Sequence, residues 1–216
     1  MADPLLVIAI DGPAGAGKST IGKALARELN LDYLDTGAMY RAVAWLAMHR
    51  RMSLIDGDAV AAVARGMLLV QDDTSVRVDG HDVTTAIRTT ELSEATSIVA
   101  AHPGVRAELR ERQRAWAREH GGGVIEGRDI GTVVFPDAIL KVYLEASPRV
   151  RAERRVAQTG GSVDEIERAI AERDTRDSTR SDGPLRRDDA AVHVDTSHRS
   201  VGDVVAHIVS LVAERR

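Results

Sequence analysis

The sequence predicts an α/β fold in which helices cover both faces of a parallel sheet. Short apolar runs such as Leu5–Ile10 and Ile139–Leu144 have the composition of strands that are buried on both faces. Segments with apolar residues at helical spacing follow these runs. The two kinds of segment alternate along the chain, which is typical of parallel βαβ units.

Length and composition indicate one domain, residues 1–216, with at most a small insert. Hydrophobic residues make up 44% of the chain and charged residues 29%, as in ordinary globular proteins. The net charge of −4 argues against nucleic-acid binding, and the sequence has no cysteine for disulfides. We see no membrane span and no signal peptide in Met1–Gly12. We therefore expect a cytoplasmic monomer without nucleic-acid or membrane partners.

The first part of the chain reads as strand, turn, helix, strand, helix. A Gly-rich turn joins the strand at Leu5–Ile10 to a helix at Ser19–Asn30, the usual opening of a βαβ unit. A short strand at Asp32–Leu34 and a helix at Ala38–Arg50 follow.

The middle of the chain has a different pattern. Asp79-Gly80 is a hairpin signal between short alternating segments, so we expect an antiparallel insert at residues 66–88. The expected helices of this region are Asp58–Arg65, Glu91–Ala101 and Val105–His120, and its expected strands are Leu68–Val70, Ser75–Val78 and His81–Val83.

The last part of the chain returns to buried strands and helices. Pro148 at a helix start and the break at Gly160-Gly161 suggest a short lid at residues 149–163. The expected strands are Val124-Ile125, Ile139–Leu144 and Ala191–Val194, and the expected helices are Arg149–Gln158, Asp164–Thr179 and Val201–Arg216.

A phosphate-binding loop is the strongest motif. The run Gly12-Pro13-Ala14-Gly15-Ala16-Gly17-Lys18-Ser19 fits G-x-x-x-x-G-K-[ST], with a buried strand before it and an amphipathic helix after it. Its backbone N–H groups and the helix N-terminus form an anion site. Lys18 would reach the β- and γ-phosphates of ATP, and the Ser19 hydroxyl would bind Mg²⁺, with Thr20 adjoining. The alternative is a Gly-rich turn that binds nothing.

The loop alone does not say what happens to the phosphate. GTPases need an N-K-x-D element, which this sequence lacks, and most motor ATPases are longer. A small kinase remains, and its second substrate needs a cationic site of its own. Four charged clusters in the chain could build that site.

Two charged clusters follow expected strands. Asp35, Thr36 and Arg41 lie at the end of the second strand, where Thr36 can cap the next helix and Asp35 can organise the waters around Mg²⁺. Arg128 and Asp129 lie between glycines after another buried strand. An arginine there can bind phosphate through two hydrogen bonds, and an aspartate can accept from a base amino group. The alternatives are a helix cap with a surface arginine and a charged surface loop.

Two further clusters lie on helices. Arg173, Arg176, Asp177 and Arg180 share one helical face and would bind a sugar phosphate, or form a solvated salt-bridge ladder. Arg-rich α-helical sequence also runs into the Gly160-Gly161 break, and arginines of a lid there would neutralise charge during phosphoryl transfer. The alternative is a basic surface helix. The arginines of this second helix are Arg149, Arg151, Arg154 and Arg155.

These residues together resemble the bacterial cytidylate kinases over nearly the whole chain. The run from Gly127 through Arg128-Asp129-Ile130-Gly131-Thr132-Val133-Val134-Phe135 to Pro136 is quite specific, whereas the phosphate loop is not. The other segments that carry the resemblance are Ile10–Lys18, Asp35–Arg41, Ile87–Thr89, Pro103–Arg106 and Arg173–Asp177.

The resemblance implies a three-layer P-loop kinase fold with a five-stranded parallel sheet, a small antiparallel insert near the monophosphate site and a short mobile lid. It also implies phosphoryl transfer from ATP·Mg²⁺ to CMP or dCMP, with UMP a poorer acceptor. Positions in the motifs also imply roles for single residues. Cytosine would be recognised by Ser97, Arg106 and Asp129, and the acceptor phosphate would be bound by Arg41, Arg128 and Arg180. The ribose would be bound by Arg173 and Asp177, and the lid would carry Arg151, Arg154 and Arg155.

Two positions depart from the family pattern. Thr36 stands where the family often has Ser and keeps the hydroxyl, whereas Glu126 stands where it often has Asp and carries a longer side chain. Other acceptors remain open from the residues alone, namely UMP, dTMP or a non-nucleotide such as shikimate. A module that binds ATP without turnover also remains open, although it would need neither acceptor arginines nor a lid.

Overall fold

The structure is a computed structural model that describes residues 5–72 and 74–215. Residues 1–4, 73 and 216 lie outside the described residues. The predicted domain, residues 1–216, begins and ends among them, and the predicted final helix has its last residue, 216, there. The chain divides into two compact units, Met1–Tyr33 with Ala117–Arg216 (unit 1) and Leu34–Trp116 (unit 2).

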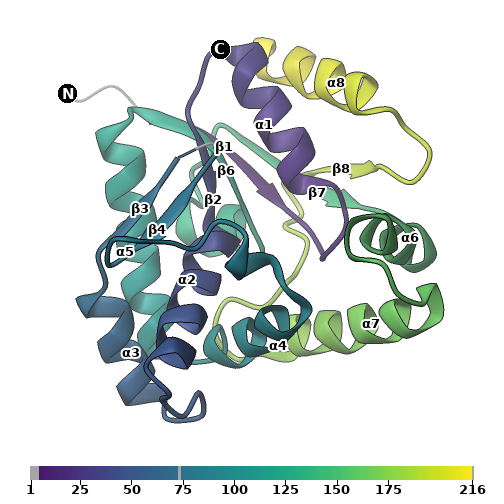
Figure 1. The fold of residues 1–216 in the computed structure, drawn as a ribbon. Helices are drawn as coiled ribbons and strands as arrows, with labels where there is room; N and C mark the ends of the chain where they lie inside the picture. Colours follow the sequence, from purple (N-terminus) through teal and green to yellow (C-terminus); the bar gives the residue numbers. More distant parts are fainter. Residues whose placement is uncertain (1–4, 73, 216) are drawn as a thin grey trace. The chain divides into compact units, whose positions relative to one another are not determined.

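A five-stranded sheet has the order β2-β6-β1-β7-β8 (Figure 1). The pairs β1–β6, β1–β7 and β7–β8 are parallel, which confirms the predicted α/β class and its parallel sheet. β1 lies between two parallel neighbours and has almost no exposed side chain, as its apolar sequence requires. The strands are β1 (Leu6–Asp11), β2 (Tyr33–Asp35), β6 (Gly122–Gly127), β7 (Leu140–Glu145) and β8 (Val192–Asp195).

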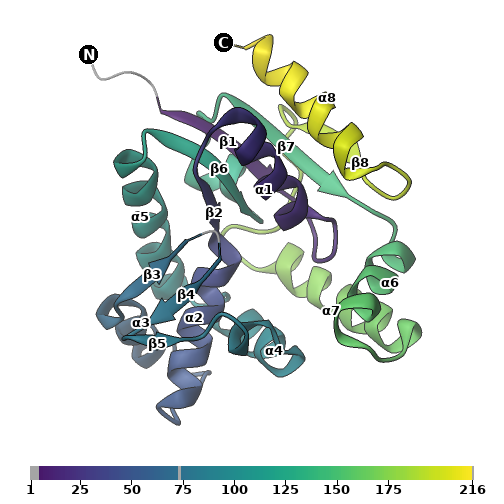
Figure 2. The same cartoon turned by 45° about the horizontal axis from the view of Figure 1, so that its top comes forward.

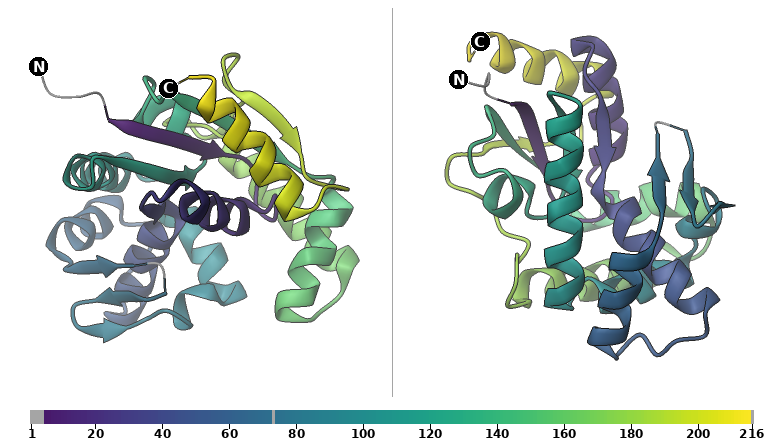
Figure 3. Two further views of the ribbon diagram at one scale, coloured as in Figure 1. Left: turned by 90° about the horizontal axis from the view of Figure 1, so that it is seen from above. Right: turned by 90° about the vertical axis from the view of Figure 1, so that its left-hand side faces the viewer.

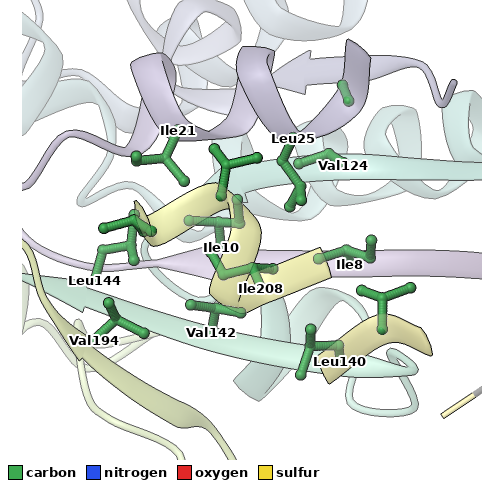
Figure 4. Packing of buried hydrophobic residues seen from close by; sticks show 14 of the residues in the cluster. Ile8, Ile10, Ile21, Leu25, Val124, Leu140, Val142, Leu144, Val194 and Ile208 are labelled. Carbon is green, nitrogen blue, oxygen red and sulfur yellow. The ribbon is translucent and has the colours of Figure 1, made fainter. Parts of the chain in front are cut away.

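Two helices of unit 1 cover one face of this sheet. α1 (Lys18–Leu29) and α8 (Val201–Ala213) lie side by side, as Figures 1 and 3 show. Side chains from both helices meet apolar side chains of the strands in a continuous cluster (Figure 4). Ile10 of β1, Leu25 of α1 and Ile208 of α8 are fully buried in it. Each such side chain contributes on the order of 2 kcal/mol by leaving water.

A pair of helices in unit 1 follows β7. α6 (Pro148–Thr159) begins with Pro148 in its first turn and with the Ser147 hydroxyl accepting from the Val150 amide at 3.3 Å. It ends at Gly160, and after a short turn α7 (Val163–Thr179) packs along it (Figure 2). Both helices agree with the sequence prediction to within one residue at each end.

Unit 2 contains a three-stranded antiparallel sheet of order β3-β4-β5. Asp79 and Gly80 both have positive φ at the turn that joins β4 to β5, which confirms the predicted hairpin. The strands are β3 (Leu69–Gln71), β4 (Val76–Val78) and β5 (His81–Asp82), and the helices are α2 (Thr36–His49), α3 (Gly57–Gly66), η1 (Ala86–Arg88), α4 (Thr90–Val99) and α5 (Pro103–Glu119), whose last turn belongs to unit 1.

Two local expectations were wrong, and one element was not anticipated. β6 is longer than the expected Val124-Ile125, because pairing with β1 draws Gly122 and Gly123 into the sheet although such glycines usually indicate a turn. The segment Ile130–Val134 forms a π-helix that the sequence pattern did not predict. Asp35, not Thr36, caps α2, and Thr36 is the first helical residue.

Within residues 5–72 and 74–215, no helix combines the length and the apolar composition needed to span a bilayer.

Truncating a core side chain of α8 should destabilise the protein strongly. Ile208→Ala leaves a cavity under the sheet and should lower the free energy of unfolding by about 3 kcal/mol. Val201 on the same helix is 44% exposed, so Val201→Ala should change the free energy of unfolding by less than ~0.5 kcal/mol. Urea unfolding followed by circular dichroism measures both values. Equal losses for the two variants would contradict the packing described.

Candidate functional site

The phosphate loop joins β1 to α1 in unit 1, at the carboxyl end of the central strand. Gly12 has φ 148° and lies so close to β7 that a Cβ would be 2.0 Å from the Leu144 carbonyl oxygen. Only glycine therefore fits at this position. Gly17 precedes α1 in a left-handed conformation without a side-chain cap. The first amides of α1 are thus left for an anion, as the motif requires.

Lys18 is held inside this loop. Its Nζ donates to the Pro13 carbonyl oxygen at 2.8 Å. Burial lowers the pKa of Lys18 to about 7, and the nearby charge of Arg128 acts in the same direction while Glu126 opposes both. A cation with these surroundings is stabilised by an incoming anion. Lys18 is therefore a partly buried cation that a main-chain carbonyl of the loop holds in place.

Glu126 binds the predicted metal ligand. The Ser19 hydroxyl donates to Glu126 Oε1 at 2.6 Å, and the Tyr33 hydroxyl donates to the same oxygen at 2.6 Å. Glu126 is buried near the end of β6, paired in register with Ile10 of β1. It therefore orients the Ser19 oxygen and places a carboxylate beside it, a donor set that suits Mg²⁺.

A resident all-protein metal site is absent from the described part of the chain. No group of three or more histidine or carboxylate side chains there could hold a metal ion. Mg²⁺ bound at Ser19 would take its other ligands from phosphate and water, as Mg²⁺ commonly does with nucleotides.

Arg128 links the phosphate loop to α7. Its Nη1 donates to the Gly12 carbonyl oxygen, and its Nε donates to Asp177 Oδ2 at 2.9 Å. Asp177 also lies 3.9 Å from Arg173 Nε and 3.8 Å from Arg180 Nη1. Burial would raise the pKa of Asp177, but these three arginines outweigh it and hold the pKa below its usual value. Three cations therefore gather around one carboxylate next to the loop.

Arg176 does not join this cluster. The sequence placed it on the same helical face as Arg173 and Arg180, yet it is exposed to solvent. Asp177, the next residue, is the one on the inward face of α7, and it is only 6% exposed. The charged stripe is thus narrower than the sequence pattern indicated.

Asp129 faces the end of α7. Arg180 Nη2 lies 3.7 Å from Asp129 Oδ1, and Arg180 Nε donates to the Gly183 carbonyl oxygen at 2.5 Å. Asp129 is 5% exposed. The structure therefore brings Arg128, Asp129, Arg173, Asp177 and Arg180 together in unit 1, from segments far apart in the sequence.

The arginines of α6 have different environments. Arg151 is buried and donates to the Ala14 carbonyl oxygen of the phosphate loop at 3.1 Å and to Asp174 at 2.5 Å. Arg154 donates to the Thr196 hydroxyl at 3.0 Å, and Thr196 donates in turn to the Ala16 carbonyl oxygen at 3.0 Å. Two of the predicted lid arginines are therefore connected to the phosphate loop in this conformation.

The other two arginines of α6 are more exposed than Arg151. Arg155 is half-buried, and Arg149 is exposed and pairs with Asp164 and Glu167 of α7.

Unit 2 contains the other predicted residues. Asp35 Oδ1 accepts from the Ala38 amide at 2.9 Å, and Arg41 Nη2 donates to Asp35 Oδ2 at 2.7 Å. Thr36 is buried beside them. The first turn of α2 thus presents one arginine held by one carboxylate.

Ser97 and Arg106 lie on neighbouring helices of unit 2. Arg106 of α5 is 1% exposed, donates to the Ala100 carbonyl oxygen at 3.3 Å and lies 5.5 Å from the centre of the Tyr40 ring. The Ser97 hydroxyl of α4 is buried and has no hydrogen-bond partner among the described residues. A buried hydroxyl without a partner indicates a site that is completed by a ligand or by water.

Sequence reasoning missed the roles of Glu126 and Asp174. Glu126 was noted only as a departure from a family pattern, although a carboxylate at the end of a buried parallel strand is a signal for a ligand site. Asp174 had no signal, because its contact with Arg151 joins two helices and depends on their packing.

Comparison with known proteins places these motifs in one family. The cytidylate kinase family model matches residues 8–214. A cytidylate kinase of Streptomyces avermitilis is 45% identical over 99% of this chain and 95% of its own length. A bifunctional pantoate ligase/cytidylate kinase of a Synechococcus strain is 48% identical over 95% of this chain, which spans only 40% of that longer protein.

Solved structures support the fold. An uncharacterised protein from Eubacterium ventriosum matches with a TM-score of 0.57 at 10% identity, covering 96% of this chain and 98% of its own. The protein TT1252 from Thermus thermophilus matches with a TM-score of 0.52 at 18% identity, covering 97% of both chains.

Removing the carboxylate that holds Ser19 should weaken the effect of Mg²⁺ on nucleotide binding. Glu126→Gln should reduce the gain in ATP affinity that Mg²⁺ confers by about tenfold or more, because supporting partners of a metal ligand have effects of this size. Titration calorimetry with ATP, with and without Mg²⁺, measures this gain. Glu145→Gln at the end of β7 is the matched control. An unchanged gain in Glu126→Gln would refute the role of Glu126.

Proposed function

This chain belongs to the cytidylate kinase family, and from that premise we propose that it transfers the γ-phosphoryl group of ATP to CMP or dCMP, giving ADP and CDP or dCDP. The observation that carries the proposal is the arginine cluster around Asp177, whose member Arg128 also contacts the phosphate loop through Gly12. Cations beside a triphosphate site fit a second anionic substrate better than they fit hydrolysis or storage of ATP.

The donor side would bind and orient the triphosphate. The loop amides from Gly12 to Ser19 and the N-terminus of α1 would bind its phosphates, and Lys18 would exchange the Pro13 carbonyl for a phosphate oxygen. Ser19, oriented by Glu126, would hold Mg²⁺, which supplies charge neutralisation at the phosphates when bound. Asp35 is a further candidate, as the residue that would orient the waters around the metal ion.

The acceptor side would hold the monophosphate in line with the donor. Arg128 and Arg180 would exchange their carbonyl partners for phosphate oxygens while Asp177 keeps them in orientation, and we propose that Arg41 binds the phosphate while Asp35 holds it. Arg173 and Asp177 would bind the ribose. A monophosphate oxygen is already anionic at neutral pH, so the reaction needs positioning and charge stabilisation more than a general base.

The lid arginines would neutralise the transferring group. Arg151, Arg154 and Arg155 lie on the helix of the proposed lid, residues 149–163. Arg151 and Arg154 bind main-chain and side-chain oxygens around the phosphate loop. An anion at the loop offers these guanidinium groups stronger partners than neutral carbonyls.

The base would be recognised by polar groups whose arrangement fits cytosine and not uracil. Asp129 would accept from the cytosine amino group, with Ser97 and Arg106 on the other polar edges. Uracil presents an oxygen at that position, so two acceptors would face each other, which costs a few kcal/mol in a buried site. We further propose that residues 66–88 are the insert next to the acceptor, and that the enzyme is a cytoplasmic monomer.

The proposal is tested by acceptor choice. ADP formation from ATP·Mg²⁺ is measured with CMP, dCMP, UMP, dTMP and AMP side by side. We expect turnover with CMP and dCMP and much lower kcat/KM with the other acceptors. Turnover with a different acceptor would keep phosphoryl transfer and overturn the cytidylate assignment, and no turnover at all would favour a binding module.

Removing a clustered arginine should abolish most activity. Arg128→Ala should lower kcat/KM for CMP by about 100-fold or more, because it removes a charged donor that binds the acceptor phosphate. Arg176→Ala removes an exposed arginine from α7, the helix that carries Asp177, and should leave kcat/KM within about twofold of the wild-type value. Similar losses in the two variants would show that overall charge, not this cluster, supports the reaction.

Changing the proposed base-reading carboxylate should alter selectivity. Asp129→Asn can turn its amide to donate to uracil, so the ratio of kcat/KM for CMP to that for UMP should fall by about tenfold or more. Asp137→Asn, an exposed residue further along the same segment, serves as the control. A ratio that stays at the wild-type value would exclude Asp129 as the discriminating residue.

A further inference from the structure

Asp11 is a buried carboxylate that none of the roles above uses. It is the last residue of β1, directly before Gly12 of the phosphate loop, and only 6% exposed. Its Oδ1 accepts from the Ile130 amide at 2.8 Å, and its Oδ2 accepts from the Gly131 amide at 2.8 Å. Both oxygens are therefore committed to two successive main-chain N–H groups.

These two amides follow directly after the proposed acceptor residues Arg128 and Asp129. Arg128 itself donates to the Gly12 carbonyl oxygen. Three hydrogen bonds thus connect the segment 128–131 with residues 11 and 12 at the end of β1. Two of the three depend on the side chain of Asp11, and both of those lie in the interior, where hydrogen bonds to a charged group are strong.

The backbone here is shaped for this contact. A Cβ at Gly131 would lie 3.1 Å from two side-chain carbons of Lys141 and 3.4 Å from Asp11 Oδ2, so a larger residue would push the amide away from the carboxylate. The residues from Ile130 to Val134 form a π-helix, a rare conformation that is frequent at functional sites. Asp11 holds the first two amides of this element.

We propose that Asp11 is a positioning residue for the acceptor: its carboxylate fixes the amides of Ile130 and Gly131 and thereby sets Arg128 and Asp129 at a defined distance from the phosphate loop. This inference rests on the proposed function. Asp11 acts through the main chain and touches neither substrate itself. Its contribution should appear in acceptor binding, because donor binding depends on the loop that follows it.

The surroundings of Asp11 make this contribution sensitive to pH. The charges of Lys18 and Asp129 act on Asp11, Tyr143 of β7 pairs with it in register, and the stem of Lys141 lies against the neighbouring Gly131. Burial raises the pKa of Asp11 to about 6, and the charge of Asp129 adds to this, while the two amides and Lys18 oppose the rise. The carboxylate is ionised above this value and loses an acceptor site when it is protonated below it.

Two substitutions separate charge from geometry. Asp11→Glu keeps the charge beside Lys18 but moves the carboxylate by one methylene, so it cannot meet both amides without a backbone shift. Asp11→Asn keeps the size but offers an acceptor to only one amide. In both variants we expect KM for CMP to rise about tenfold or more. In Asp11→Glu, KM for ATP should stay within about twofold. Asp56→Asn alters an aspartate that accepts an amide at the start of α3 and is the control.

A pH profile supplies a readout that a merely structural role would not change. KM for CMP is measured from pH 5 to 8 for the wild type and for Asp11→Asn, and the ratio of the two is taken, because titration of the CMP phosphate then cancels. The advantage of the wild type should be largest above pH 6 and should shrink as the pH falls below 6. Calorimetric titration with CMP alone gives its affinity without turnover.

The outcomes are distinct. Selective rises in KM for CMP with a pH-dependent ratio support the proposal. Equal rises for ATP and CMP in Asp11→Glu would overturn it, as would wild-type constants in both variants, while the cytidylate assignment would stand. A wild type that phosphorylates no cytidine monophosphate would overturn the proposed function and this inference together. Should Asp11→Glu fail to fold, Asp11→Asn and the calorimetric affinities still decide.

Discussion

The cost of buried positive charge is the constraint on which this site depends. An enzyme that binds two phosphorylated substrates must hold arginines and a lysine largely away from water, and unpaired charges there cost several kcal/mol each. In unit 1, ion pairs offset this cost. Asp177 pairs with Arg128, Arg173 and Arg180, and Asp174 pairs with Arg151. Each guanidinium keeps a partner, so the cluster is already formed before an anion arrives.

The same pairing explains how the site can change partners. Arg128 binds a carbonyl oxygen of the phosphate loop, Lys18 binds another, and Arg151 binds a third. Neutral carbonyls are weaker acceptors than phosphate, so an incoming anion can replace them without leaving the cation unpaired. The carboxylates meanwhile keep the arginines in orientation. Under the proposed function, this arrangement would combine affinity for phosphate with a preorganised geometry, which is what phosphoryl transfer requires.

The parallel sheet supplies the positions. β1 and β6 are neighbours in register, so Asp11 lies opposite Gly127 and Ile10 opposite Glu126. Their carboxyl ends therefore bring the phosphate loop, the carboxylate that orients Ser19 and the segment 128–131 to the same edge, as open parallel sheets do. The elements are distant in the sequence, and they meet because strands with apolar side chains on both faces must pair in the interior.

From the sequence alone we could predict the α/β class, the five strands, the hairpin at Asp79-Gly80, the phosphate loop and the family. These rest on local signals, namely apolar runs, glycine positions and motif spacing, which hold wherever the segment lies. Other features became clear only from the three-dimensional packing. Asp35 and not Thr36 caps α2, and Arg176 is exposed while Asp177 is buried. Glu126 binds Ser19, Asp174 binds Arg151, and Asp11 binds the amides of residues 130 and 131. The partner of a charged residue depends on which segments pack together, and the spacings along one segment do not contain that information.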